Sequence, residues 1–465
     1  MFLNRESELK ELDRLWAAKK ANLIILYGRR RVGKSSLLKF FGKDKPIFYW
    51  TATKTTTKML LQSFSRQLQL FKDPKASIPG DFSYPNWESA LTDLAQYSRQ
   101  NKIFIVFDEF PYAIETEGEL PSLLQKIWDD NFSGSKANIC ITGSRIGMIE
   151  KQILSSSGPL YGRASAIMWL DPLPISVFNK FLPNYSKSQL VEVYSVTGGV
   201  PFYIEIFDRS ISVLANIERE VRSKASVIKG EPYFLIHEEL KEPVRYVAIL
   251  EAIGDGLRTQ SQISTAVGIE QTHLGPYLHT LEGLRFIKRE IPVTEEPKKS
   301  RKGAYLISDM FMKFYFRFIA PNINLIEGGR EDKLVSIIAG QFDAYVGKNG
   351  FEEICRKWLI SEAKKAQLPF DPDIVGRYWD SSVEIDCAAI SKKHKSIIIG
   401  EAKWGSKKLT LAVLNELNKK ADYFSKKFGF HVNKMIFGRS GFDAGLTERA
   451  KIENVRLVTL DEMLT

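Results

Sequence analysis

The chain has 465 residues, of which 44% are hydrophobic, and it carries a formal net charge of +11. This length allows about three domains with cores of their own. The positive charge favours a polyanionic partner, nucleic acid ahead of an acidic membrane surface. The three cysteines lie far apart and the five histidines do not cluster, which argues against a disulfide framework or a zinc site. With no apolar run of about 18 residues and no recognisable signal peptide, the sequence predicts a cytoplasmic protein without a membrane partner.

The N-terminal segment, Phe2 to Leu15, predicts an amphipathic helix with Leu9, Leu12 and Leu15 on one face and Asn4 or Ser7 as its cap. Its pattern, F-x-x-R-E-x-E-L, resembles the opening of many AAA+-type ATPases, in which the segment lies beside the adenine. An ordinary amphipathic helix explains the same pattern equally well.

A phosphate-binding loop follows the first predicted strand, Leu23 to Leu26. The loop reads G-x-x-x-x-G-K-S, and an apolar helix comes after it, which is the context that this motif requires. Its glycines let successive backbone N–H groups turn toward phosphate oxygens, and the helix N-terminus favours the same anion. The loop therefore predicts ATP binding, and the residues expected to hold the nucleotide are Gly28, Arg29, Arg30, Arg31, Val32, Gly33, Lys34, Ser35 and Ser36.

A second strand is predicted at 46–51, helices at 55–70 and 87–97, and a loop at 73–85. Lys102 to Phe110 is then a buried strand that ends in two carboxylates, the Walker B arrangement. Asp108 is expected to hold Mg²⁺ together with Ser35, and Glu109 is expected to polarise the attacking water.

Asn138 to Arg145 is the next apolar strand that ends in polar residues. In AAA+-type folds this strand end lies near the γ-phosphate, which makes Ser144 the expected sensor and Thr142 the alternative. Arg163, in the tract Tyr-Gly-Arg, is expected to act as an arginine finger, with a plain surface arginine as the alternative.

Strands that alternate with helices predict an α/β fold with a doubly wound parallel sheet over residues 1–170. Residues 171–240 are expected to form a helical lid, interrupted at Thr197-Gly198-Gly199-Val200-Pro201. Residues 1 to about 310 resemble the archaeal-type ATPase family, a branch of the AAA+/STAND proteins. The matching tracts are Arg5-Glu6, GRRRVGKSS, FDEFPY with Asp108, Glu109 and Tyr112, TGS, YGR and GGVPFY.

Residues 241–310 predict a winged helix-turn-helix. Helices are expected at 244–252 and 259–267, and a recognition helix at 271–284 with Leu274, Tyr277, Leu278, Leu281 and Leu284 facing the core. The wing strands are expected at 287–291 and 304–307. Lys298, Lys299, Arg301 and Lys302 lie between them and suit the DNA backbone, although a winged helix can also contact protein.

The aromatic run 311–319 is expected to be a packing helix within a connecting segment, 311–340. In the last part, 341–465, a hairpin of strands 383–390 and 396–404 is predicted around a lysine-rich turn. If Ile390 faces Ile397, alternation places Asp386 opposite Glu401 and Glu384 opposite Lys403. Two carboxylates beside a lysine suit metal-dependent phosphodiester hydrolysis, with Asp386 and Glu401 as the metal ligands.

The same residues resemble the PD-(D/E)xK nuclease superfamily, which has a restriction-endonuclease-like α/β fold, and the domain of unknown function often fused to archaeal-type ATPases. The resemblance assigns the metal acids to Asp386 and Glu401, the lysine to Lys403 and a helix glutamate to Glu352, with Glu353 as the alternative. Ile385 stands where the superfamily has proline.

The sequence thus predicts a DNA-binding ATPase whose metal-dependent deoxyribonuclease is controlled by nucleotide state. The expected cofactors are ATP and Mg²⁺, with Mn²⁺ as an option at the nuclease site, and the expected partner is DNA, with a homo-oligomer left open. Two rival hypotheses are a regulatory or signalling switch whose nuclease fold only binds, and a DNA-remodelling motor that does not cleave.

Overall fold

A computed structural model of the chain describes residues 3–296, 300 and 302–464. The chain divides into two compact units. The first comprises residues 1–173 with 200–202, and the second comprises 174–199 with 203–465. Of the cationic group predicted for the wing, Lys298, Lys299 and Arg301 lie outside the described residues. No helix in the described ranges combines the length and the apolar character that crossing a bilayer requires.

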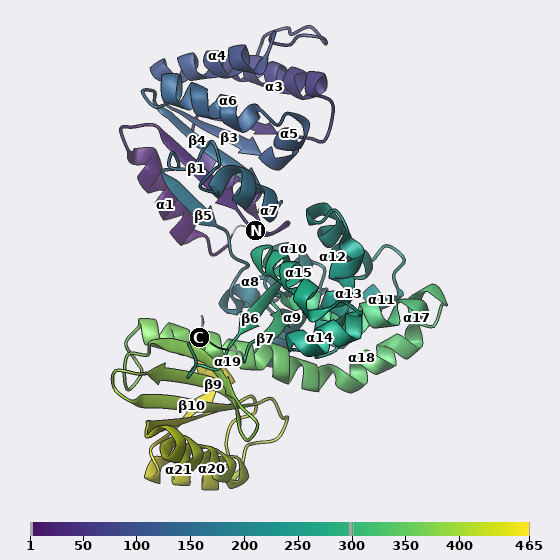
Figure 1. The fold of residues 1–465 in the computed structure, drawn as a ribbon, viewed down its shortest axis with the longest axis vertical. Helices are drawn as coiled ribbons and strands as arrows, with labels where there is room; N and C mark the ends of the chain where they lie inside the picture. The colour runs from purple at the N-terminus through teal and green to yellow at the C-terminus, as the bar shows by residue number, and fades with distance from the viewer. Residues whose placement is uncertain (1–2, 297–299, 301, 465) are drawn as a thin grey trace. The chain divides into compact units, whose positions relative to one another are not determined.

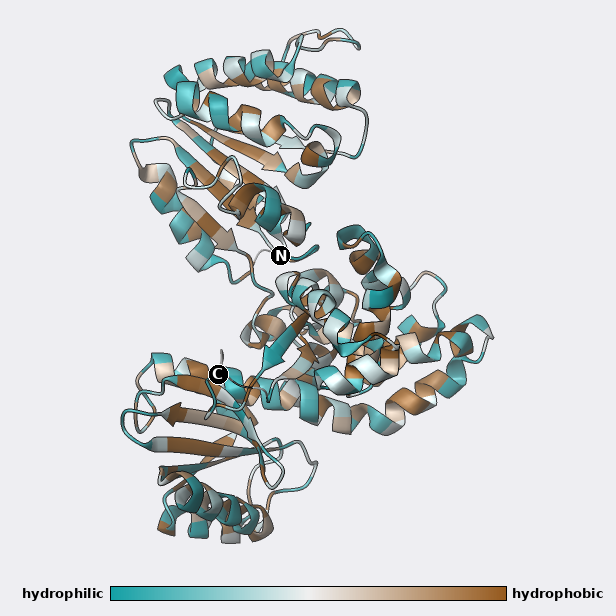
Figure 2. Cartoon of the chain, in the orientation of Figure 1, coloured by the Kyte–Doolittle hydropathy of each residue, from teal (hydrophilic) through white to brown (hydrophobic). Residues whose placement is uncertain are grey.

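The first unit is a five-stranded sheet in the order β2-β3-β4-β1-β5, and all of its strands are parallel. The strands are β1 (Asn22–Tyr27), β2 (Ile47–Thr51), β3 (Ile103–Asp108), β4 (Ala137–Gly143) and β5 (Ala166–Trp169). Every residue of β1, β3 and β4 is buried, as expected for strands covered on both faces. This confirms the predicted parallel α/β sheet, and Figure 2 shows its strands as predominantly hydrophobic.

Helices cover both faces of this sheet (Figure 1). Alternate residues of the strands pack on α1 and α2 on one side, and on a cluster of aromatic residues from α3 and α4 on the other. The α-helices of the unit are α1 (Glu6–Ala17), α2 (Lys34–Gly42), α3 (Thr57–Lys72), α4 (Trp87–Gln100), α5 (Phe110–Thr116), α6 (Leu120–Ile127) and α7 (Ile146–Ile149). Two π-helical turns, η1 (Trp128–Phe132) and η2 (Glu150–Leu154), extend α6 and α7.

The expected cap of the first helix was wrong. The helix begins at Glu6, and neither Asn4 nor Ser7 caps it, because Arg5 occupies the capping position and makes no side-chain cap. Arg5 instead pairs with Glu8 at 3.1 Å and donates to the backbone carbonyl of Val32 at 3.0 Å.

The second unit begins with the helical segment predicted as a lid. Its elements are η3 (Ile175–Val177), α8 (Phe178–Phe181), α9 (Lys187–Thr197), α10 (Pro201–Glu205), α11 (Val213–Arg222) and α12 (Val227–Glu239), with the first residues of α10 assigned to the first unit. Gly198 and Gly199, both with positive φ, end α9, which matches the predicted break.

Three helices and a two-stranded antiparallel hairpin follow, at the places predicted for the winged helix. They are α13 (Pro243–Gly254), α14 (Gln260–Val267), α15 (Gln271–Gly283), β6 (Ile287–Glu290) and β7 (Ala304–Ile307). Leu274, Leu278 and Leu281 are buried as expected, but Tyr277 is only partly buried and accepts a hydrogen bond from Arg245 at 2.5 Å.

The connecting segment leads into a second sheet. It comprises α16 (Met310–Phe314), η4 (Tyr315–Ile319), η5 (Ala320–Asn322), α17 (Ile323–Glu327), α18 (Glu331–Tyr345) and η6 (Val346–Phe351). The sheet is mixed and has the order β12-β11-β10-β9-β8. Its elements are α19 (Glu352–Lys364), β8 (Ile374–Trp379), β9 (Glu384–Ser391), β10 (Ser396–Lys403), α20 (Leu411–Phe428), β11 (His431–Gly438), α21 (Ala444–Ile452), β12 (Val455–Thr459) and α22 (Leu460–Met463). Figure 1 shows α19 on one face and α20 with α21 on the other.

A buried glutamate joins three helices of this unit. Glu353 of α19 accepts a hydrogen bond from the Tyr194 hydroxyl of α9 at 3.0 Å. It also pairs with Lys357 at 3.1 Å and with Lys313 of α16 at 3.8 Å. Burial alone would raise the pKa of Glu353, but Lys357 and Lys313 outweigh burial and lower that pKa to about 2.

This network predicts an acid-sensitive contribution to stability. A carboxyl whose pKa is lowered on folding stabilises the protein above its unfolded pKa, and the contribution is lost as pH falls toward the folded pKa. Glu353→Gln should therefore lower the free energy of unfolding of the second unit at pH 7 by about 3 kcal/mol, and the difference should shrink below pH of about 4.5. Urea denaturation followed by hydrogen exchange of α9 and α19 amides measures it.

The neighbouring Glu352→Gln variant is the matched control. Burial and Asp386 raise the pKa of Glu352 to about 7, so the neutral amide should not destabilise the unit at pH 8. Equal losses in the two variants, or a Glu353→Gln deficit independent of pH, would contradict the assignment.

Candidate functional site

The phosphate-binding loop connects β1 to α2 with backbone conformations that glycine adopts readily. Gly33 has a φ of 101° and Gly28 a φ of 156°. A Cβ on Gly28 would lie 2.8 Å from the carbonyl oxygen of Leu170, so a side chain does not fit there. Between them, Val32 is fully buried and Arg31 also has a positive φ, of 66°. The ammonium of Lys34 donates to the loop carbonyls of Gly28, at 2.9 Å, and Arg29, at 3.0 Å.

The loop is held from two sides by arginine contacts that the sequence did not reveal. Arg5, directly before α1, is buried and donates to the Val32 carbonyl. The Arg31 guanidinium lies 3.8 Å from the ring centroid of Phe202. Arg30 also lies in the loop, while Ser36 is exposed on the first turn of α2.

The carboxyl ends of β1 and β3 bring two of the predicted magnesium ligands together. The Ser35 hydroxyl donates to Asp108 Oδ2 at 2.8 Å. Tyr49 of β2, a residue not singled out from the sequence, donates to the same oxygen at 2.5 Å. Burial and the Asp108 carboxylate raise the pKa of Tyr49 well above its usual range, so it stays a neutral donor.

Glu109 has a positive φ, of 50°, which is uncommon for a residue with a side chain. Its Oε2 accepts hydrogen bonds from the Ser144 hydroxyl at 2.9 Å and the Ser144 N–H at 3.1 Å. The structure thus brings together the residues predicted as base and sensor. Thr142, the alternative sensor, is fully buried, and its hydroxyl has no hydrogen-bond partner among the described residues.

Within the part of the chain that the structure describes, Arg163 pairs with Asp129 rather than with the phosphate-binding loop. Its guanidinium makes a bidentate contact with Asp129, with distances of 2.9 Å and 2.7 Å, at the surface beside α6. The role of Arg163 as an arginine finger stays a prediction.

In the second unit, the hairpin of β9 and β10 has the predicted register where Ile390 faces Ile397 and Ala388 faces Ile399. The ladder ends at Cys387 and Gly400, one pair before Asp386 and Glu401. A shift in the pairing of β8 with β9 at this end explains the difference. Glu384 is paired with Arg377 of β8 at 2.6 Å, and the ladder does not extend to the predicted positions of Glu384 and Lys403.

The predicted acidic and lysine residues still form one cluster. Asp386 Oδ2 accepts the Ala402 N–H at 3.1 Å, and Lys403 contacts Glu401 Oε1 at 2.7 Å. Burial and the Glu401 carboxylate raise the pKa of Asp386, as expected for two acids close together. Burial lowers the pKa of Lys403, but the Glu401 carboxylate raises it by more, so the pKa lies above its usual value.

The two candidate helix glutamates face different surroundings. Glu352 contacts Arg356 and Arg377, each at 3.5 Å, and its raised pKa reflects burial and the nearby Asp386. Glu353 instead faces Tyr194 and Lys313. Of the two alternatives, Glu352 is therefore the one that belongs to the Asp386 cluster.

Three further residues of this cluster were missed from the sequence. Lys420 of α20 contacts Glu401 Oε2 at 2.6 Å, Arg356 donates to the Asp386 backbone carbonyl at 2.9 Å, and Arg377 contacts Glu352. Both carboxylate oxygens of Glu401 are therefore bonded to lysines. Within the described ranges, no three His, Cys, Asp or Glu side chains are grouped so as to hold a metal ion.

Two family models match the chain. One is described as an ATPase domain predominantly from Archaea and matches residues 2–207, and the other is described as archaea bacterial proteins of unknown function and matches residues 315–421. An uncharacterized protein of Methanocaldococcus jannaschii is 33% identical over 404 residues, covering 87% of this chain and 88% of that protein. An uncharacterized ATP-binding protein of the same organism is 62% identical over 47 residues, which are 10% of this chain and 80% of that protein.

Among solved structures, a Walker-type ATPase of Pyrococcus abyssi is similar, with a TM-score of 0.53 and 22% identity. The match covers 68% of this chain and 96% of that one. At this identity the likeness shows the fold, that of a P-loop ATPase.

The contact between Arg5 and the loop predicts an effect on nucleotide affinity. Arg5→Leu removes the donor to the Val32 carbonyl, and an unsatisfied buried acceptor costs about 1–3 kcal/mol. We expect affinity for a fluorescent ATP analogue, measured by titration, to fall about tenfold. Arg14→Leu is the control, because Arg14 pairs with Glu11 on the surface of α1 and should leave affinity unchanged. An unchanged affinity in Arg5→Leu would contradict a role in shaping the loop.

Proposed function

This chain belongs to the ATPase family found predominantly in Archaea, and we propose that it uses ATP binding and hydrolysis to control DNA binding and DNA cleavage by its second unit. The observation that carries the ATP part is the 2.8 Å contact between Ser35 and Asp108, made where the ends of two parallel strands meet beside the phosphate-binding loop.

The residues at this point fit a magnesium-bound nucleotide. A hydroxyl and a carboxylate are the hard oxygen donors that Mg²⁺ prefers, and Ser35 and Asp108 supply them. Mg²⁺, when bound, supplies charge neutralisation at the phosphates. Lys34 would exchange its bonds with the loop carbonyls for phosphate oxygens, and the Gly28–Gly33 backbone would point its N–H groups at the same anion.

Glu109 is the proposed general base. Its bonds to Ser144 hold the carboxylate at the end of β4, where Ser144 is proposed to report on the γ-phosphate. Release of Glu109 from Ser144 would free the carboxylate to accept a proton from the attacking water.

The chain path supports control of the second unit by nucleotide. Residues 200–202 belong to the first unit, while α9 directly before them belongs to the second. Arg31 of the phosphate-binding loop covers the ring of Phe202, and Tyr194 of α9 donates to Glu353. A change in the loop would therefore act on a segment that is covalently continuous with a buried network of the second unit.

The DNA-binding part of the proposal rests on α13–α15 with the β6–β7 hairpin, interpreted as a winged helix. Gln271, His273 and His279 of α15 are exposed. A recognition helix needs exposed polar side chains of this kind to contact the edges of the DNA bases. The net charge of +11 favours the phosphate backbone.

The cleavage part rests on the cluster of Asp386, Glu401, Lys403 and Glu352. Asp386 and Glu401 are the proposed ligands of Mg²⁺ or Mn²⁺, which would supply activation of water and stabilisation of the leaving oxygen. Lys403, beside Glu401 at 2.7 Å, would orient the nucleophile or neutralise the developing charge.

A second candidate function is a nucleotide-dependent regulatory switch whose second sheet only binds DNA. The specific observation in its favour is that Lys403 and Lys420 occupy both oxygens of Glu401. A divalent ion would have to displace at least one of these ammonium groups.

The ATPase assignment predicts separable losses in two variants. Glu109→Gln should retain affinity for ATP but lower kcat by at least about 100-fold, because it removes only the general base. Lys34→Ala should instead weaken ATP binding, because it removes the ammonium that meets the phosphates. Steady-state phosphate release and analogue titration measure the two effects, and hydrolysis retained in Glu109→Gln would assign the base to another residue.

The nuclease assignment predicts nicking of supercoiled plasmid with Mg²⁺ or Mn²⁺. The activity should be lost in Lys403→Ala and kept in Lys408→Ala, an exposed lysine of the following loop. Lanes with and without ATP, beside Lys34→Ala, would reveal whether nucleotide controls cleavage. Absence of cleavage on supercoiled, linear and branched DNA, with DNA-stimulated ATPase activity intact, would favour the regulatory switch.

A further inference from the structure

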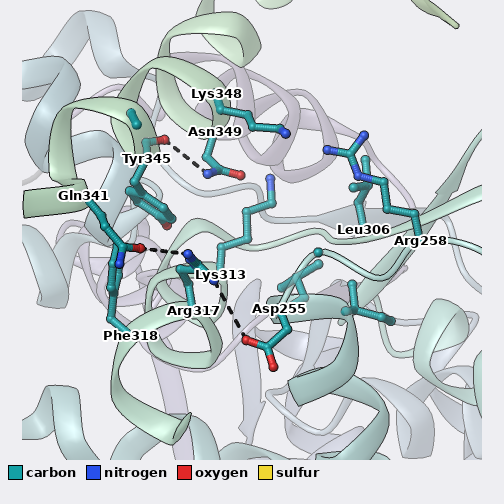
Figure 3. Close-up of a pocket in the computed structure, with 15 residues that line it drawn as sticks. Asp255, Arg258, Leu306, Lys313, Arg317, Phe318, Gln341, Tyr345, Lys348 and Asn349 are labelled. Carbon is teal, nitrogen blue, oxygen red and sulfur yellow. Dashed lines mark hydrogen bonds and ion pairs between the residues drawn. The ribbon is translucent and has the colours of Figure 1, made fainter. Parts of the chain in front are cut away.

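The second unit contains a cavity of about 510 Å³ that no residue of the acid and lysine cluster lines. Figure 3 shows the residues around it. Its walls come from segments far apart in the sequence: the loop after α13, strand β7, the α16–η4 helix, and the α18–η6 helix. Cavities of this size commonly hold ligands as large as a nucleotide.

Four cations and one acid line the cavity. The cations are Arg258, Lys313, Arg317 and Lys348, and the acid is Asp255. Figure 3 shows the ends of Arg258, Lys313 and Lys348 directed toward the same space from three sides. The Arg317 guanidinium donates a hydrogen bond to Gln341 Oε1 at 2.7 Å and lies 3.9 Å from Asp255 Oδ1.

The charges that point into the cavity are poorly compensated by the protein. Lys313 lies 3.8 Å from Glu353, which is already held by Lys357 and Tyr194. Burial lowers the pKa of Lys313 to about 8. In the described part of the chain, no acidic side chain pairs with the Arg258 guanidinium or the Lys348 ammonium. Gathering like charges is unfavourable unless an anion neutralises them.

The kind of anion follows from the donors. A guanidinium offers a planar fork that matches two oxygens of a phosphate or carboxylate, and ammonium groups add point charges from other directions. Three cations around one space exceed the single charge of a carboxylate, and the two charges of a phosphate monoester neutralise more of them. Leu306 supplies an apolar wall, and the Asn349 side chain lies on the same side as Lys348.

We propose that this cavity binds the phosphate monoester group of a nucleotide-sized ligand, either a free nucleotide or the phosphorylated end of a nucleic-acid strand. The ligand would bridge the loop after α13, helix α16 and η6. Since η6 runs directly into α19, binding would fix the start of the helix that carries Glu352.

Calorimetric titration of the full chain in a Lys34→Ala background tests this site, because that background removes the main phosphate donor of the other nucleotide site. The probes are AMP, adenosine, inorganic phosphate, and short oligonucleotides with a 5′-phosphate or a 5′-hydroxyl. AMP or the 5′-phosphorylated strand should bind at least about tenfold more tightly than its unphosphorylated counterpart. Preference for AMP identifies a free nucleotide, and preference for the phosphorylated strand identifies a nucleic-acid end.

Variants decide whether the binding belongs to this cavity. Lys348→Ala and Arg258→Ala should each weaken it about tenfold, whereas Lys333→Ala, an exposed lysine elsewhere on α18, should not change it. Lys348 is exposed and bonds to no acid among the described residues, so its truncation leaves folding intact. No phosphate-dependent binding of any probe, or binding that is equal in Lys348→Ala and Lys333→Ala, would overturn the proposal. Neither result would affect the ATPase assignment.

Discussion

The arrangement of the second unit depends on neutralising one buried carboxylate. Glu353 lies in the first turn of α19, and its partners come from α9, α16 and its own helix. Removing both lysines would leave a buried charge without a counter-ion, which costs several kcal/mol. Close backbone approach reinforces the same junction, because a Cβ on Gly350 would overlap the Ser195 hydroxyl of α9, and Tyr345 donates to the Ser195 carbonyl at 3.1 Å. Helices from three parts of the sequence are thus fixed around one side chain.

Glu352, directly before Glu353, lies in different surroundings. Successive residues of a helix point about 100° apart, so Glu352 faces the mixed sheet while Glu353 faces α9. Their pKa values move in opposite directions, Glu352 upward through burial and Asp386, and Glu353 downward through its lysines. A single helical turn therefore combines a structural ion pair with a carboxyl whose pKa is raised, and a shift of α9 would act on the residue next to Glu352.

The elements predictable from the sequence are those that local pattern determines. The apolar strands leading to Ser35 and Asp108 and the pairing of Ile390 with Ile397 follow from periodicity and from the rule that parallel strand ends share one edge. Periodicity does not report a register shift, so the pairing beyond Cys387 was misjudged. Lys420 and Arg377 were missed because they reach the cluster from α20 and β8, and only tertiary packing determines which polar residues of those elements point inward. The cationic cavity has no sequence signature for the same reason.

The segment after β6 ties the hairpin to the sheet that carries the acid cluster. Strand β8 is the edge of that sheet, and an uncovered edge invites pairing with other chains. Val293 covers it by donating to the Arg377 carbonyl at 2.9 Å and by burying its side chain in the core of the sheet. Withdrawing the hairpin would expose this valine, at a cost of about 1.5–3 kcal/mol, together with the edge itself. Arg377 belongs to β8, and its side chain contacts both Glu352 and Glu384. A displacement of the hairpin would therefore act on the acid and lysine cluster through one residue of β8.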